Sequence, residues 1–216
     1  MAGLSSKCFC GLARQESQGN RIVGGSETAV NEFPWQVRVE YILPVWEIEV
    51  CGGSLISNRW VLTAFHCTML VGEDGSVETL LLPNQIILYL GEHDIKTKSE
   101  SNVVKMGISE VVRHDRFGER WFGDYDFALL KMKRNIDFSR SPHIRPICLP
   151  QKLDNDYSNY KATVSGWGMV EYDDQADTSS VLLKVELKVM TNAECVDKPY
   201  IYTSPANDTC PDFKGK

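Results

Sequence analysis

The stretch CGGSLISNRWVLTAFHC, residues 51–67, combines the features from which we infer the fold. It contains two short runs rich in apolar residues, CGGSLIS (51–57) and RWVLTAF (59–65), separated by a single Asn. Runs of this kind, interrupted by Gly, Pro, Asn or Asp, are typical of β-strands joined by turns. Similar runs follow along the chain: PWQVRVEYIL (34–43), QIILYLG (85–91), VVKMGISEVVRH (103–114), DFALLKM (126–132), KATVSGWG (161–168) and LLKVELKVM (182–190). Helical periodicity is limited to residues 64–69 and 192–196, so the sequence predicts an all-β fold.

The composition is that of an ordinary globular protein that can bury a core. The 216 residues carry 29 acidic and 23 basic side chains, a net charge of −6, without a long run of one sign. This charge argues against nucleic acid or an anionic membrane as a partner. No apolar run reaches the roughly 18 residues of a membrane-spanning helix, and MAGLSSKCFC (1–10) lacks the apolar stretch of a signal peptide.

Seven cysteines are scattered along the chain: Cys8, Cys10, Cys51, Cys67, Cys148, Cys195 and Cys210. No two of them form a C-x-x-C pair, so disulfides explain them better than a zinc site. Because disulfides form in oxidising compartments, we expect an extracellular protein, although no signal peptide is present. The missing signal and the odd cysteine count lead us to expect that the natural chain differs at both ends.

Several motifs, taken in order, resemble those of the trypsin and chymotrypsin family of serine endopeptidases from Arg21 to the last residue. They are RIVGG (21–25), PWQV (34–37), CGGSLIS (51–57), LTAFHC (62–67), DFALLKM (126–132), RPICLP (145–150) and SGWG (165–168). The LGEHD motif and the long insertion between Cys67 and Gly91 are most similar to the clotting and immune proteases of arthropods. The resemblance implies a trypsin-like double antiparallel β-barrel. Its parts would be a connector at 1–21, the first barrel at 22–147, and a linker with an incomplete second barrel at 148–216.

The resemblance assigns His66 and Asp126 as two catalytic residues. A histidine can accept and return a proton near neutral pH, provided that a buried carboxylate fixes its tautomer. Asp126 would accept the Nδ1 proton so that Nε2 faces a nucleophile. Asp124 is the nearest competitor, but only Asp126 directly precedes the apolar FALL run. The other histidines, His93, His114 and His143, are expected to be ordinary surface or core residues.

The resemblance also implies a zymogen. Cleavage between Arg21 and Ile22 by a trypsin-like protease would free the Ile22 ammonium, which in the family pairs with an aspartate beside the nucleophilic serine.

The disulfides that the family implies pair Cys51 with Cys67, Cys195 with Cys210, and Cys10 with Cys148. These pairs leave Cys8 without an assigned partner. The triplet NDT at Asn207 is an N-glycosylation sequon.

The nucleophilic serine itself is absent from the sequence. Family members carry it in GDSGG, on a turn whose N–H groups form the oxyanion hole, and neither GDSGG nor any G-x-S-x-G occurs here. Ser54 belongs to an early strand, and SGWG is not the substrate-binding SWG of the family, which lies beyond the serine. We therefore expect that this chain alone cannot hydrolyse peptides, and that the complete protein extends past Lys216 by roughly 50–60 residues.

Two further features depart from the family pattern. Phe65 stands where a small residue usually precedes the histidine. Overpacking costs about 1–3 kcal/mol unless a neighbour compensates, and we expect such a compensating neighbour here.

Glu92 and Glu100 bracket a loop similar to the family's calcium loop, but Lys96 and Lys98 lie inside it and oppose a cation. We therefore predict no metal and no cofactor.

Three interpretations of function stay open. The first is an incomplete piece of a secreted, trypsin-like endopeptidase, with protein substrates, an activating trypsin-like protease and protease inhibitors as partners. The second is a non-catalytic homologue that acts as a binding or regulatory protein. The third, an unrelated all-β binding protein, is disfavoured by the ordered motifs. Substrate preference cannot be inferred, because the family's specificity pocket lies beyond the motifs present.

Overall fold

The fold is described by a computed structural model that covers part of the chain in detail. The described residues are 10–13, 21–22, 25–42, 50–71, 77–97, 102–119, 124–150, 157–168, 178–191 and 193–194. Strands dominate these residues, and helical turns are short, as in η1 (His66–Thr68) and η2 (Pro83–Gln85). The predicted all-β class is therefore confirmed.

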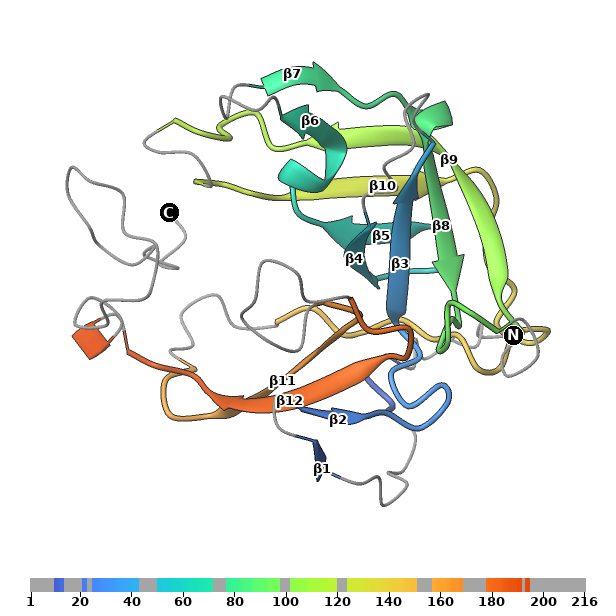
Figure 1. The fold of residues 1–216 in the computed structure, drawn as a ribbon. Helices are drawn as coiled ribbons and strands as arrows, with labels where there is room; N and C mark the ends of the chain where they lie inside the picture. Colours follow the sequence, from blue (N-terminus) through green and yellow to red (C-terminus); the bar gives the residue numbers. More distant parts are fainter. Residues whose placement is uncertain are drawn as a thin grey trace, which may run out of the picture.

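Six of the strands form a closed antiparallel barrel, which lies in the upper half of Figure 1. The strands follow one another around the barrel in the order β10-β5-β4-β3-β8-β9. Their bounds are β3 (Gln36–Tyr41), β4 (Val50–Leu55), β5 (Trp60–Thr63), β8 (Ile86–Leu90), β9 (Val104–Arg113) and β10 (Ala128–Met132). A separate hairpin, β6 (Met69–Val71) with β7 (Val77–Leu80), lies above the barrel in Figure 1. Closure pairs both edges of the six-stranded sheet, so the barrel leaves no edge strand exposed.

The barrel interior is filled by apolar residues, which alternate strictly with partly exposed residues along two of the strands. In β8 and β10 every second residue is buried, which places Ile86, Leu88, Leu90, Leu130 and Met132 in the core. This alternation with a period of two is what a half-buried strand requires. Removing the interior from water supplies the main driving force for folding this half of the chain.

One glycine is needed for the barrel wall to close. Gly53 lies on β4 where the chain crosses close to β5, and a Cβ at this position would lie 2.8 Å from Cγ1 of Val61. A side chain there would push the two strands apart. Close packing therefore explains the second glycine of CGGSLIS, Gly53.

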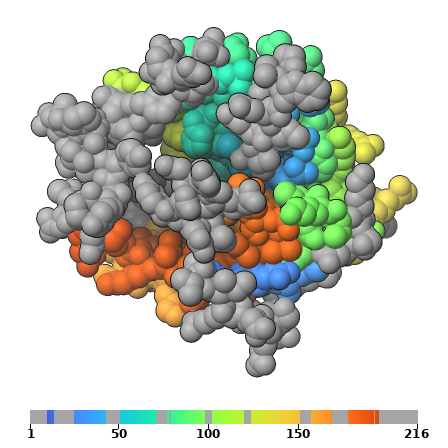
Figure 2. All heavy atoms as spheres, in the orientation of Figure 1, coloured from blue at the N-terminus to red at the C-terminus, as the bar shows by residue number. Residues whose placement is uncertain are grey.

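A second sheet lies beside the barrel in the order β1-β2-β12-β11. It contains β1 (Arg21–Ile22), β2 (Gly25–Glu27), β11 (Lys161–Gly166) and β12 (Leu183–Lys188). The segment that follows the expected cleavage site thus pairs with the second half of the chain. Figure 2 shows the blue surface of residues 25–42 beside the orange surface of the β11–β12 region. The assignment of residues from 22 onward to the first barrel stays a prediction.

The second sheet does not close into a barrel among the described residues. Val164 lies opposite Val185 and Ala162 lies opposite Leu187, so these four side chains share one face. Val164 and Leu187 are 52% and 51% exposed, unlike the core of the closed barrel. This open apolar face matches the predicted double-barrel architecture with an incomplete second barrel.

The two sheets meet at His93, which is 2% exposed. Its carbonyl oxygen accepts hydrogen bonds from the backbone of Leu182 (3.0 Å) and from the indole nitrogen of Trp167 (2.9 Å). Its Nε2 lies 3.1 Å from Oε1 of Glu27 on β2. His93 is therefore a hydrogen-bonded buried residue at the junction, as the sequence suggested.

Candidate active site

The His66–Asp126 pair lies at one end of the barrel, where β5 and β10 place its two members side by side. β5 ends at Thr63 and is separated by two residues from η1, which begins at His66, and Asp126 comes two residues before β10. Ala128 on β10 pairs with Thr63 on β5, so the segments that lead to both residues are neighbours. Two residues 60 positions apart in sequence are thereby brought together.

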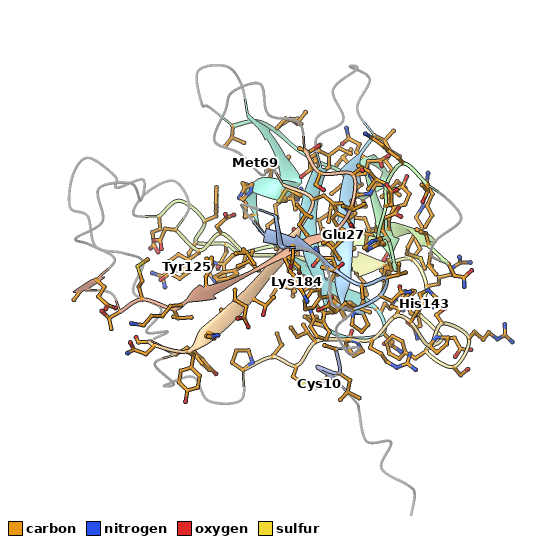
Figure 3. The ribbon with its side chains drawn as sticks, turned by 60° about the horizontal axis from the view of Figure 1, so that its bottom comes forward. Cys10, Glu27, Met69, Tyr125, His143 and Lys184 are labelled. Carbon is orange, nitrogen blue, oxygen red and sulfur yellow. A yellow bond between two sulfur atoms is a disulfide. The ribbon has the colours of Figure 1, made fainter. Side chains whose placement is uncertain are left out.

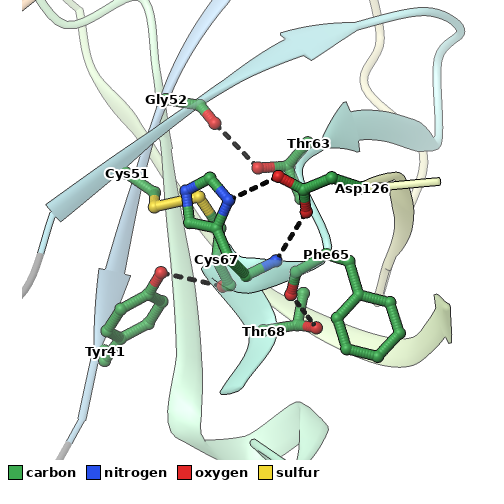
Figure 4. Close-up of a disulfide and its surroundings, with 9 residues drawn as sticks. Tyr41, Cys51, Gly52, Thr63, Phe65, Cys67, Thr68 and Asp126 are labelled. Carbon is green, nitrogen blue, oxygen red and sulfur yellow. Dashed lines mark hydrogen bonds and ion pairs between the residues drawn. A yellow bond between two sulfur atoms is a disulfide. The ribbon is translucent and has the colours of Figure 1, made fainter. Parts of the chain in front are cut away.

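Both oxygens of the Asp126 carboxylate are bound to His66 (Figure 4). Oδ2 lies 2.6 Å from Nδ1 of the imidazole, and Oδ1 accepts the backbone N–H of the same residue at 2.9 Å. With a neutral imidazole, the first contact places the proton on Nδ1, because a carboxylate can only accept it. Nε2 is then left with its lone pair, ready to accept a proton from another group.

The pair is open to solvent on one side. The side chain of His66 is 53% exposed and that of Asp126 is 25% exposed, more than expected for a buried carboxylate. The exposed face is where a reacting group could approach.

Hydrogen bonds and a disulfide hold the turn that carries His66 in place. The hydroxyl of Tyr41 donates to the carbonyl of Cys67 (2.8 Å), and Cys67 is joined to Cys51 on β4 by a disulfide (Figure 4). The guanidinium of Arg113 donates to Oγ1 of Thr68 and to its carbonyl oxygen, both at 2.8 Å. Sequence reasoning missed Arg113, because nothing in the motif shows which long side chain reaches across the barrel rim.

These contacts leave no thiolate for a metal beside the histidine. Ligand atoms of Cys51, His66 and Cys67 lie within 4.8 Å of one another. The two sulfur atoms, however, are joined in the disulfide, and a metal binds cysteine as the thiolate. These three residues therefore form a disulfide-linked turn rather than a metal centre.

The comparisons with known proteins agree with this geometry. Residues 22–216 match the protein-family model described as Trypsin. The chain belongs to the trypsin family. Among curated relatives of this trypsin-family chain, coagulation factor XI of Bos taurus is 34% identical over 177 residues, which cover 81% of the chain and 25% of that protein.

Two relatives from Drosophila melanogaster are similar to a comparable degree. Serine proteinase stubble is 32% identical over 194 residues, covering 88% of the chain and 23% of that protein. Melanization protease 1 is 33% identical over 197 residues, covering 83% and 46%. The trypsin-family chain thus spans about a quarter to a half of the length of these relatives.

The two disulfides found in the described residues have the pairing that the resemblance implied. Cys51–Cys67 cross-links the turn that carries His66 to β4, and Cys10–Cys148 joins residues 138 positions apart (Cys10 is labelled in Figure 3). The remaining expected sites, Cys195, Cys210 and Asn207, lie outside the described residues, as does Cys8. The structure describes the backbone of Arg21 and Ile22 as β1, paired with β2.

Phe65 is accommodated without loss of the His66–Asp126 contact. Its side chain is 9% exposed, and its ring stacks on Phe117 with centroids 3.9 Å apart and planes at 4°. We expected a neighbour to make room for this ring. The neighbour is instead another aromatic ring, which lies parallel to it and fills the space.

A cluster of largely buried charges lies on β3 and just after β8. Arg38 forms an ion pair with Glu40 (2.7 Å) and lies 3.8 Å from Glu92, whose side chain is 7% exposed. Burial raises the pKa of Glu92, while Arg38 opposes this shift. Oε1 of Glu92 is buried without a hydrogen-bond partner in the described part of the chain. Ionised Glu92 therefore costs the folded state free energy.

Replacing Glu92 with Gln is expected to stabilise the protein at neutral pH. The pKa of Glu92 in the folded protein lies above its ordinary value of 4.5, so between these two values the folded state holds more protons than the unfolded state. The free energy of unfolding therefore falls as the pH rises between them. The advantage of E92Q should thus be present at pH 7 and shrink below pH 4.5. Urea unfolding at pH 7 and pH 4 measures it, with the exposed Glu186→Gln as control. An advantage that grows in acid would contradict this prediction.

Proposed function

We propose that the chain supplies the histidine and aspartate of the active site of a secreted serine endopeptidase, which becomes active after cleavage between Arg21 and Ile22. The observation that carries the proposal is the two-point contact between the Asp126 carboxylate and His66. The two relatives named proteinase and protease support the same activity. The disulfides support an extracellular location.

In the proposed mechanism His66 moves the proton and Asp126 holds the imidazole. Nε2 accepts the hydroxyl proton of a serine as its oxygen attacks the scissile carbonyl, and the imidazolium is stabilised by Asp126. His66 then returns the proton to the leaving amine. A water molecule repeats the two steps and releases the acyl group from the serine. The serine and its oxyanion hole would lie outside residues 1–216, since these residues contain no elbow motif.

Activation would leave the connector attached. The Cys10–Cys148 disulfide spans the bond between Arg21 and Ile22, so cleavage there divides the chain without releasing residues 10–21. The proposed partners are an activating trypsin-like protease, protein substrates and protease inhibitors. The proposed parts are the connector at 1–21, the first barrel at 22–147, and the linker with the second barrel from 148.

The transcript tests whether a nucleophile exists. We expect an in-frame GDSGG sequence within roughly 50–60 codons after Lys216, the length needed to complete the second barrel. A stop codon directly after Lys216 would instead favour the non-catalytic homologue, acting as a binding or regulatory protein. The absence of any serine elbow in residues 1–216 is the observation that keeps this alternative.

A purified 216-residue chain is expected to be inactive. Without an activated serine it should neither hydrolyse amide substrates with Arg or Lys at the cleavage position nor react with a serine-directed phosphonate. Mass spectrometry measures the labelling, and His66→Ala is the matched control. Stoichiometric labelling that disappears in H66A would overturn this expectation.

A further inference from the structure

The residues that immediately precede His66 and Asp126 are both aromatic, and both contact one turn. Phe65 stacks on Phe117 as described above. Tyr125 stacks on His114, with centroids 4.7 Å apart and planes at 11°. The turn begins at His114 and ends at Phe117, whose N–H donates to the carbonyl of His114 (3.3 Å). We name residues 114–117 the aromatic turn.

Tyr125 needs this support because its backbone is in a disfavoured conformation. Its φ of 53° lies in the left-handed region, which bulky residues rarely adopt. The N–H of Phe127 donates to the carbonyl of Tyr125 across Asp126 (2.7 Å), so the chain bends sharply at the carboxylate. The guanidinium carbon of Arg116 also lies 4.5 Å from the centroid of the Tyr125 ring. The aromatic turn therefore supports the bend that aims Asp126 (Tyr125 is labelled in Figure 3).

Phe65 connects the same turn to His66. Its carbonyl oxygen accepts both the N–H (2.8 Å) and the hydroxyl (2.7 Å) of Thr68, so Phe65 begins the turn that carries His66. Figure 4 shows its ring extending away from the Cys51–Cys67 disulfide. The disulfide and the ring thus hold this turn at two different points.

We propose that Phe117 is a positioning residue of the active site. Its ring stacks on Phe65, which begins the turn of His66, while the rest of the aromatic turn contacts Tyr125, which precedes Asp126. The aromatic turn thereby sets the separation of Nδ1 of His66 and Oδ2 of Asp126. The ring acts through Phe65. The expected effect on catalysis rests on the proposed function, whereas the expected effect on the contact between His66 and Asp126 does not.

The test compares Phe117→Leu, which removes the ring, with Phe117→Tyr, which keeps it. In the 216-residue chain, the proton on Nδ1 of His66 gives an NMR signal that is identified by its loss in H66A. We expect this signal to be lost through solvent exchange in F117L and retained in F117Y. Phe65→Ala removes the same stack from the other side and should lose the signal as well. Tyr160→Ala, in the separate Tyr157–Tyr160 pair, is the control and should retain it.

In the complete activated protein, F117L should lower kcat about tenfold with little change in KM, since small misplacements of catalytic groups slow the chemical step. An F117L chain that keeps the wild-type Nδ1–H signal would overturn the proposal, whatever the activity. Wild-type kcat in F117L would overturn its catalytic part and leave the endopeptidase function intact. An inactive complete protein would count against the proposed function, and the NMR comparison would still decide the role of Phe117.

Discussion

Replacing Asp126 with Asn in the complete, activated protein is expected to lower kcat by about 10⁴-fold, with little change in stability. The two contacts of the carboxylate explain why. The backbone N–H of His66 requires an acceptor at Oδ1, so the amide oxygen of Asn must occupy that position. The amide NH₂ group then faces Nδ1 and donates to it. The imidazole proton is forced onto Nε2, which can no longer accept a proton from serine.

Steady-state kinetics on D126N measures this effect, with Asp137→Asn as the matched control. Asp137 pairs with Arg140 on the surface, so D137N makes the same chemical change away from the His66–Asp126 pair. We expect D137N to keep wild-type kcat. A D126N protein within tenfold of wild-type kcat would show that Asp126 does not fix the histidine tautomer.

Replacing both Cys51 and Cys67 with Ala is expected to lower the free energy of unfolding by about 3 kcal/mol. The disulfide closes a loop with a sequence separation of 16, and cross-linking such a loop restricts the unfolded chain. Because Cys67 follows His66, the loss should also loosen the turn that carries His66. Urea unfolding of the oxidised proteins measures the difference.

Reduction provides the control for this variant. Reduction opens Cys10–Cys148 as well as Cys51–Cys67, so the wild-type protein and C51A/C67A are compared with both proteins reduced. Their free energies of unfolding should then be nearly equal, because neither protein has the Cys51–Cys67 cross-link. Peptide mapping without reductant should recover the two cysteines in one linked pair. A loss below about 1 kcal/mol, or two free thiols in protein made in an oxidising compartment, would contradict the assigned role of the disulfide.

The parts of the fold that the sequence predicted depend on short motifs with strict local requirements. CGGSLIS and LTAFHC predicted two adjacent strands and the position of His66, and the apolar run after Asp126 predicted the strand β10. The resemblance to the family implied the Cys51–Cys67 cross-link. The alternation of buried and partly exposed residues along β8 and β10 places apolar side chains in the barrel interior. Such signals lie within a few residues, so they can be interpreted without knowing the rest of the structure.

The features that could not be predicted depend on contacts between distant loops. Arg113 could have pointed to solvent, and only the closed barrel shows that it reaches Thr68. The stack of Phe65 on Phe117 joins residues 52 positions apart, and sequence reasoning treated Phe65 as a problem of volume alone. The aromatic residues before His66 and Asp126 were a usable signal, but their common contact with residues 114–117 requires the loop conformation.

The most direct test of the central claim, that His66 and Asp126 belong to a serine endopeptidase, is phosphonate labelling of the complete transcript product after cleavage between Arg21 and Ile22. We predict stoichiometric labelling of one serine outside residues 1–216, which is absent before cleavage and absent in H66A. A cleaved, folded, complete product that takes up no label would contradict the claim and leave the non-catalytic homologue as the function.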